Sequence, residues 1–147
     1  MKLAIAVALS HHAKLLILDE PTSGLDPFMR DEILDILYEF TRAEDQSVLI
    51  SSHIVSDLER LCDYIAYIDQ GSLKLYEEKD RLIEQYGILK CSKEELKEFD
   101  EQAVKGVRKN SYGVEALVDK LKMPKDYKTD TATLEEIIVF LSKGQEE

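Results

Sequence analysis

The sequence has few cysteines and no long apolar run, and each of these features excludes some classes of protein. Its two cysteines, Cys62 and Cys91, lie far apart, which leaves neither a disulfide framework nor the close spacing of a metal site. We therefore expect two reduced thiols in a cytoplasmic protein. No stretch reaches the roughly 18 to 20 apolar residues that a membrane-spanning helix requires.

Positive charge is also scarce, chiefly in the first part of the chain. Residues 1–78 hold 15 acidic and 6 basic side chains, whereas residues 79–147 hold 15 and 13, and the formal net charge is −11. Because an acidic surface repels a phosphate backbone, we expect no nucleic-acid partner. A length of 147 residues with 44% apolar content predicts one globular domain, or a cut-down domain with a small appendage.

A short apolar run near the start allows two interpretations. Lys2 followed by residues 3–9 resembles a miniature secretory signal. The run is at the short limit for such a signal, and a strand pattern follows it closely. We therefore prefer a buried helix over residues 3–12, which are rich in Ala and Leu.

The next segments alternate between strand and helix patterns. Residues 15–18 and 47–51 are short apolar runs, typical of strands buried on both faces in a parallel sheet. Asp26 and Pro27 predict the start of a helix, because Asp caps helices and Pro suits their first turn. Apolar residues at helical spacing continue that helix to about residue 43.

Further along, a second helix and a hairpin are expected. The helix spans about residues 54–61, with Ser56 and Glu59 in a capping-box pattern. Residues 64–68 and 73–76 flank Asp69-Gln70-Gly71, which predicts a β-hairpin. The alternation of strands and helices up to this point predicts an α/β layer with helices on the faces of a parallel sheet.

After about residue 78 the predicted helices and strands are short and carry many charged residues. Ser92 with Glu95, and Thr133 with Glu136, fit capping boxes. This part predicts a small α+β appendage, residues 79–147, after a core that covers residues 1–78. The expected helices are 79–86, 93–99, 112–121 and 133–142, and the expected strands are 88–91 and 103–108.

Polar side chains follow both buried strands, at the edge where ligands bind in open α/β sheets. Asp19 and Glu20 end the first strand, and His53 follows the second. Adjacent carboxylates can hold Mg²⁺ and accept a proton from water, and an imidazole can hydrogen-bond a phosphate oxygen. Each residue alone is equally typical of a turn or a cap, so the hypothesis depends on their combination.

At this point the motifs resemble a known family. Residues 15–27, LLILDEPTSGLDP, are similar to the Walker B motif and D-loop of ATP-binding-cassette (ABC) ATPases. His53, preceded by VLISS, resembles the switch histidine of that family, and residues 57–65 match the run that follows it. The resemblance covers residues 1–78. Residues 79–147 are more loosely similar to C-terminal extensions of ATPase subunits in bacterial exporters.

The resemblance implies a fold, a function and a role for each matching residue. The fold would be a partial P-loop ATPase core, and the protein would hydrolyse ATP to drive transport, in the direction of export. Asp19 would support Mg²⁺ through water, Glu20 would be the general base, and His53 would contact the γ-phosphate of ATP. The other cofactor-binding positions would be Ser23, Gly24 and Asp26, in a D-loop at a dimer interface.

The resemblance also implies partners and a location. A second ATP-binding subunit and transmembrane permease subunits would be the partners. The protein would lie in the cytoplasm, held at the inner face of the cell membrane through the permease.

Three motifs of the family do not occur in the sequence: the Gly-x-x-x-x-Gly-Lys-[Ser/Thr] loop, the glutamine loop and the Leu-Ser-Gly-Gly-Gln signature. In the family the signature precedes a helix like residues 3–9, so Met1 is expected to fall just after it. Phosphoryl transfer depends on positioning and charge stabilisation by the phosphate loop. We expect the isolated chain to bind ATP very weakly without hydrolysing it, and to expose apolar sheet edges.

Two further functions remain open. The chain could be a non-catalytic interaction or regulatory module that pairs with a complete ATPase subunit. A metal-dependent phosphatase using Asp19 and Glu20 is disfavoured, because no further carboxylate or histidine cluster joins them in the sequence.

Overall fold

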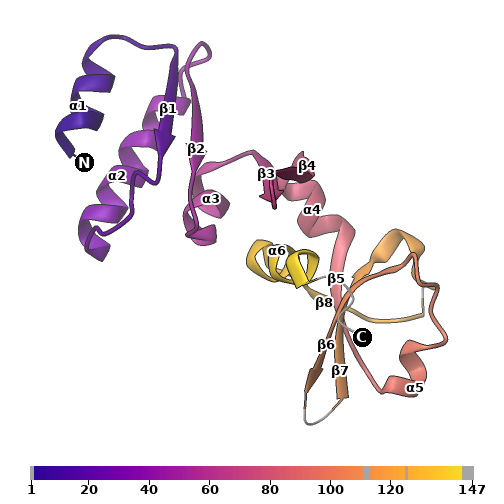
Figure 1. Ribbon diagram of the computed structural model, residues 1–147. Coiled ribbons are helices and arrows are strands. Elements are labelled where there is room, and N and C mark those ends of the chain that lie inside the picture. Colours follow the sequence, from indigo (N-terminus) through magenta and orange to yellow (C-terminus); the bar gives the residue numbers. More distant parts are fainter. Residues whose placement is uncertain (1, 111–112, 125, 144–147) are drawn as a thin grey trace. The chain divides into compact units, whose positions relative to one another are not determined.

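The computed structural model describes residues 2–110, 113–124 and 126–143, and the chain divides into two compact units. The first unit is Met1–Cys62 and the second is Asp63–Glu147 (Figure 1). The predicted boundary between an ATPase core and an appendage, near residue 79, falls inside the second unit and stays a prediction. The expectations that concern Met1 and Tyr112 lie outside the described residues.

The first unit is built around two parallel strands. Leu15 pairs with Ser47 and Asp19 with Ser51, so the two strands run side by side without a register shift. Helices precede, connect and follow them, which confirms the predicted α/β class. The elements are α1 (Lys2–Ser10), β1 (Leu15–Asp19), α2 (Pro27–Thr41), β2 (Ser47–Ser51) and α3 (Val55–Leu61).

The core of this unit lies on one face of the strand pair. Leu16 of β1 is buried together with Ile33 and Leu37 of α2, at the helical spacing that the sequence predicts. The other face carries the side chains of Ile17 and Leu49, which are exposed. The prediction of strands buried on both faces is therefore wrong for this chain, because the helices in contact with these strands share a single core on one face.

Helix α1 is also less buried than predicted. Ile5 packs into the core, but Leu3 and Val7 are exposed. An Ala- and Leu-rich segment favours a helix wherever it lies. The helix is therefore confirmed, whereas the prediction that it is buried holds for only one stripe, because the described neighbours contact only that stripe.

The start of α2 confirms the predicted cap. The carboxylate of Asp26 accepts a hydrogen bond from the backbone N–H of Met29, 3.1 Å away, and Pro27 occupies the first turn. The capping box predicted for α3 is wrong. Ile54 stands at its N-cap without a side-chain hydrogen bond, and the hydroxyl of Ser56 instead accepts from Arg30.

The second unit joins a hairpin to a four-stranded antiparallel sheet. The hairpin turns through Gln70 and Gly71, whose φ values of 47° and 73° are those of a tight turn that glycine favours. The sheet has the strand order β6-β7-β5-β8. The elements are β3 (Tyr64–Asp69), β4 (Ser72–Glu78), α4 (Lys79–Gln85), β5 (Tyr86–Cys91), α5 (Lys93–Leu96), β6 (Val104–Asn110), β7 (Gly113–Asp119), η1 (Lys120–Lys122), β8 (Asp130–Thr131) and α6 (Leu134–Lys143).

One predicted helix of this unit is a strand. Residues 112–121 were expected to be helical, but β7 occupies most of that range and lies between β5 and β6 in the sheet. Glu115, Ala116 and Leu117 favour a helix by intrinsic propensity. Pairing on both edges and burial on both faces override that preference, because propensity is worth only a few tenths of a kcal/mol per residue.

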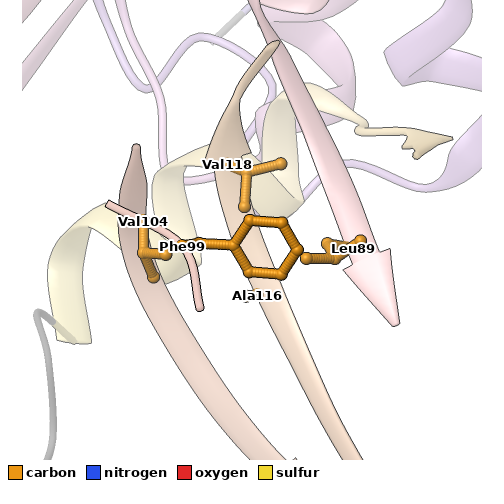
Figure 2. Close-up of a cluster of buried hydrophobic side chains, with 5 residues drawn as sticks. All are labelled: Leu89, Phe99, Val104, Ala116 and Val118. Carbon is orange, nitrogen blue, oxygen red and sulfur yellow. The ribbon is translucent and has the colours of Figure 1, made fainter. Parts of the chain in front are cut away.

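The sheet of the second unit has apolar side chains on both faces. Ala116 and Val118 of β7 contact one cluster, whereas Leu117 between them points to the opposite face. The aromatic ring of Phe99 closes the first cluster from a loop (Figure 2). This cluster consists of Leu89, Phe99, Val104, Ala116 and Val118.

Two capping boxes of the second unit confirm their predictions. Ser92 and Glu95 exchange side-chain and backbone hydrogen bonds at α5, and Thr133 and Glu136 do so before α6. The hydrogen bond from the Ser92 backbone lowers the pKa of the Glu95 carboxyl, because it favours the charged form. Within the described residues, no helix has the length and apolar character needed to span a membrane.

Candidate functional site

The two parallel strands of the first unit end in polar side chains at one edge. Asp19 and Ser51 are register partners, and the hydroxyl of Ser51 donates a hydrogen bond to the Asp19 carboxylate. The backbone N–H of Glu20 donates to the carbonyl of Ser51, with a nitrogen–oxygen distance of 3.0 Å. Parallel pairing therefore carries the ends of both strands to the same place.

Glu20 and His53 are in direct contact just beyond these strand ends. Oε1 of Glu20 accepts a hydrogen bond from the backbone N–H of His53 at 2.9 Å. Oε2 lies 2.8 Å from Nδ1 of His53, which donates in the tautomer that carries its proton there. The side chains of Glu20 and His53 are 34% and 70% exposed, so the pair is open to solvent and to a ligand.

Backbone geometry helps to direct the Glu20 side chain. Its φ of 47° lies in the left-handed region, which is uncommon for a residue with a Cβ and is concentrated at functional sites. The chain thus turns sharply directly after the strand. Asp19, directly before this turn, is hydrogen-bonded to Ser51, whereas Glu20 is hydrogen-bonded to His53.

The loop from Ser23 to Asp26 follows Glu20 directly. The N–H of Ser23 donates to the carbonyl of Glu20 at 3.2 Å, and Gly24 has a φ of 70° that its lack of a Cβ allows. The structure thus brings Asp19, Glu20 and His53 to one edge. Ser23 and Gly24 lie exposed on the adjoining loop, and the Asp26 carboxylate caps α2.

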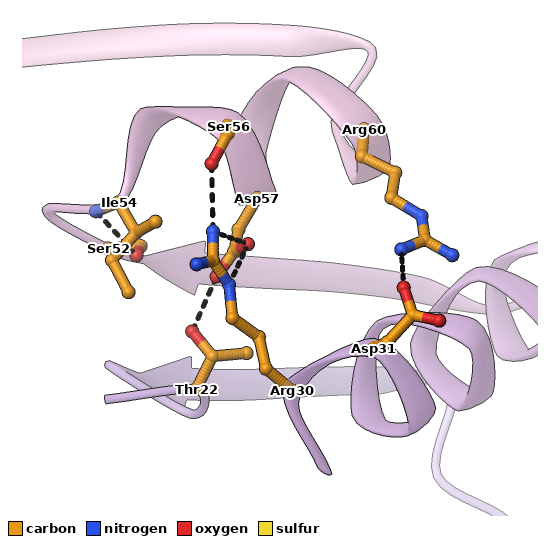
Figure 3. Close-up of polar contacts among 8 residues, drawn as sticks. All are labelled: Thr22, Arg30, Asp31, Ser52, Ile54, Ser56, Asp57 and Arg60. Carbon is orange, nitrogen blue, oxygen red and sulfur yellow. Dashed lines mark hydrogen bonds and ion pairs between the residues drawn. The ribbon is translucent and has the colours of Figure 1, made fainter. Parts of the chain in front are cut away.

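A buried polar cluster behind this edge was missed by the sequence reasoning. The hydroxyl of Thr22 and the guanidinium of Arg30 both donate to the carboxylate of Asp57, and Arg30 also reaches Ser56 (Figure 3). From the sequence, Ser56 was expected only to cap a helix. Contacts across 27 and 35 residues leave no local pattern that could have revealed them.

A second ion pair joins the same two helices at the surface. Arg60 of α3 donates to Asp31 and, at 2.5 Å, to Asp35, both on α2. The hydrogen bond to Asp31 raises the pKa of Arg60, and its attraction to both carboxylates adds to the effect. These side chains are well exposed, so solvent screens the pair and its contribution to stability is small.

Magnesium is the metal that the resemblance implies, and the chemistry of the edge suits it. Within the described part of the chain, no group of three or more His, Cys, Asp or Glu side chains could hold a metal ion. Mg²⁺ is commonly held by one or two carboxylates together with phosphate and water oxygens. The exposed carboxylate of Asp19 supplies a ligand of that kind, so the residues fit Mg²⁺ bound with a nucleotide rather than alone.

Parts of this chain match known proteins. Residues 2–56 match a family model described as "AAA domain, putative AbiEii toxin, Type IV TA system". The lantibiotic transport ATP-binding protein SrtF of Streptococcus pyogenes is 46% identical over 79 residues, which are 54% of this chain and 34% of that protein. The bacitracin transport ATP-binding protein BcrA of Bacillus licheniformis is 44% identical over 72 residues, or 49% of this chain and 24% of that protein.

Over about half of its length, this chain is homologous to the ATP-binding proteins of ABC transporters. The aligned part spans about a quarter to a third of the length of these relatives. A solved structure described as "An inward-facing conformation of a putative metal-chelate type ABC transporter" aligns with 78% of this chain and 44% of its own chain. That alignment has 21% identity and a TM-score of 0.48.

Proposed function

We propose that this chain forms the hydrolytic edge of an ABC transporter's ATP-binding protein, and that the whole protein couples ATP hydrolysis to export. The observation that carries the proposal is the contact between Glu20 and His53 at the ends of two parallel strands. Relatives named for lantibiotic and bacitracin transport support the same function.

In this proposal Glu20 is the general base. A carboxylate that is one-third exposed can accept a proton from an attacking water molecule, provided that it is aimed at that water. Two contacts with His53, through the backbone N–H and through Nδ1, orient the carboxylate. His53 is more exposed than Glu20, and its imidazole would also contact the γ-phosphate.

Asp19 has a different task, because it faces different neighbours. Its carboxylate is held by the Ser51 hydroxyl at the strand end, and it would hold Mg²⁺ through water. When bound, Mg²⁺ neutralises negative charge on the phosphate oxygens of ATP. Ser23, Gly24 and Asp26 would lie in the D-loop, facing the nucleotide of a second ATP-binding subunit.

The partners and location follow from the same proposal. A second ATP-binding subunit would complete each nucleotide site, and permease subunits would hold the protein at the inner face of the membrane. The chain by itself lacks a phosphate-binding loop, so we expect it to hydrolyse no ATP alone.

The test is ATP-driven transport by the complete transporter carrying Glu20→Gln. Because glutamine keeps the shape but cannot accept the proton, we expect turnover to fall by about 10²- to 10⁴-fold. Nucleotide binding should be retained. Asp31→Asn, at the surface pair with Arg60, is the matched control and should transport normally.

Transport by the Glu20→Gln transporter at the normal rate would reject Glu20 as the base. Turnover of ATP by the 147-residue chain alone, abolished by Glu20→Gln, would reject its expected inactivity. If the coding DNA upstream of Met1 contains no in-frame phosphate-loop motif, a module that pairs with a complete subunit becomes the better account.

A further inference from the structure

Asp57 is the most deeply buried carboxylate of the first unit, and its environment is unusual for that reason. Its side chain is only 1% exposed, and Thr22, which contacts it, is also buried. A buried carboxylate is costly unless its oxygens are fully hydrogen-bonded and its charge is balanced. A carboxylate in such a place is therefore a candidate for a specific role as well as for packing.

The contacts of Asp57 satisfy both conditions. Oδ2 accepts from the hydroxyl of Thr22 at 2.6 Å, and Oδ1 accepts from Nε of Arg30 at 2.7 Å. Nη2 of Arg30 lies 2.5 Å from the same Oδ1 and also donates to Ser56 at 2.8 Å. Charge-assisted hydrogen bonds of this kind are strong and directional.

The sequence positions of these partners connect them to the functional edge. Thr22 comes two residues after Glu20, and Asp57 comes four residues after His53. The hydrogen bond between Thr22 and Asp57 therefore joins the two segments that leave the two strand ends. Those same segments carry the contact between Glu20 and His53.

The loop of residues 23–26 is bracketed by the same carboxylate. Thr22 precedes the loop, and Arg30 follows it in the first turn of α2. Both side chains bind Asp57 from their two ends of the loop, as the converging dashed lines of Figure 3 show. One buried carboxylate of α3 thus meets two other segments, the turn after Glu20 and the start of α2.

We propose that Asp57, through Thr22 and Arg30, is a positioning residue that sets the contact between Glu20 and His53 and the path of the loop at 23–26. The structural part of this proposal concerns the chain alone. Its consequence for hydrolysis rests on the proposed function.

The surface contact of Arg60 with Asp31 and Asp35 provides a control for the positioning role of Asp57. Arg60 also joins α3 to Asp31 and Asp35 of α2 at the surface, so a substitution there changes a contact between the same two helices without changing Asp57. The surface pair touches neither Thr22 nor His53 in its hydrogen bonds. Asp31→Asn is therefore a matched control, which weakens one link between α2 and α3 and leaves the buried link intact.

The first test uses the 147-residue chain and the NMR signal of the His53 backbone amide. Glu20→Ala removes the acceptor and defines the chemical shift of an unbonded amide. Thr22→Val keeps the shape of Thr22 but lacks its hydroxyl, and we expect it to move the signal toward the Glu20→Ala position. Amide exchange should be faster by about fivefold, as expected for loss of one hydrogen bond.

Thr22→Ser restores the hydroxyl and should return the signal to the wild-type position. Asp57→Asn should shift it as Thr22→Val does, whereas Asp31→Asn should not. Amide signals of β1 and β2 report whether each variant is folded. The proposal is overturned if Thr22→Val leaves the His53 signal unchanged, or if Thr22→Ser moves it equally far.

The second test asks for the catalytic consequence in the complete transporter. Thr22→Val should lower kcat by about tenfold with little change in the KM for ATP, because it disturbs the base rather than nucleotide binding. An unchanged kcat beside a shifted His53 signal would reject the consequence for hydrolysis. Normal transport by Glu20→Gln would reject the proposed function and leave the NMR result standing.

Discussion

Glu20 and Asp57 show how surroundings give different tasks to two carboxylates of one small unit. The side chain of Glu20 is 34% exposed and its carboxylate is hydrogen-bonded to His53, so its oxygens remain accessible to a ligand. Asp57 is buried and contacts Thr22 and Arg30, so its oxygens are fully used inside the protein. The accessible carboxylate suits chemistry, and the buried one suits positioning.

Core packing at the residue scale is tested by two neighbours on α2. Leu37 is 0% exposed and Ile36 is 44% exposed. Leu37→Ala should lower the free energy of unfolding of the first unit by roughly 2 to 5 kcal/mol, because it leaves a cavity in the core. Ile36→Ala should cost much less, since Ile36 is 44% exposed and its truncation leaves no enclosed cavity.

Urea unfolding followed through the NMR signals of β1 and β2 measures both variants, with the change in midpoint reporting stability. Equal losses for Leu37→Ala and Ile36→Ala would contradict the packing described for α2.

At the scale of elements, local signals were reliable where they involve neighbours in sequence. The cap at Asp26, the turn at Gln70-Gly71 and the capping boxes before α5 and α6 were all predicted and confirmed. Strand β7 was predicted as a helix, because its state depends on β5 and β6. The box at Ser56 failed for a similar reason, since Arg30 from another helix takes its hydroxyl.

The cap of α6 offers a prediction at this scale. The hydroxyl of Thr133 accepts from the backbone N–H of Glu136, which satisfies a group that would otherwise lack a partner at the helix start. Thr133→Ala should reduce the stability of the second unit by about 1 kcal/mol. Thr133→Ser keeps the oxygen and should stay close to the wild type.

The measurement is urea unfolding followed through amide signals of α6 and β6. If the alanine and serine variants lose the same stability, the hydrogen bond at the cap is not the source of the effect.

At the scale of the whole molecule, apolar side chains remain uncovered on described surfaces. Ile17 and Leu49 are register partners on the open face of the β1-β2 pair, and both are more than half exposed. Contiguous exposed apolar groups favour association with another surface. The sequence predicted exposed apolar sheet edges, whereas the exposure described here is on a face of the strand pair.

Replacing both Ile17 and Leu49 by Thr should therefore reduce binding of an apolar fluorescent dye, and association of the chain at high concentration. The effect follows from removal of apolar area from the exposed face, and threonine is a β-branched residue that strands favour. Dye fluorescence and sedimentation measure the two results. Leu121→Thr, which changes a residue 84% exposed on the short helix η1, is the control.

Dye binding that falls equally with Leu121→Thr would mean that the exposed face of the β1-β2 pair has no special part in it. Unchanged dye binding in the double variant would contradict the prediction directly.

The sequence by itself determined the order of strands and helices in the first unit, and the presence of Asp19, Glu20 and His53 at strand ends. These features depend on apolar runs and on caps, which are properties of neighbouring residues. Only the tertiary structure decided that Glu20 contacts His53, that β7 is a central strand and that Asp57 binds Thr22 and Arg30. Each of these joins residues far apart in the chain, and such pairings are selected by burial and register in the folded molecule.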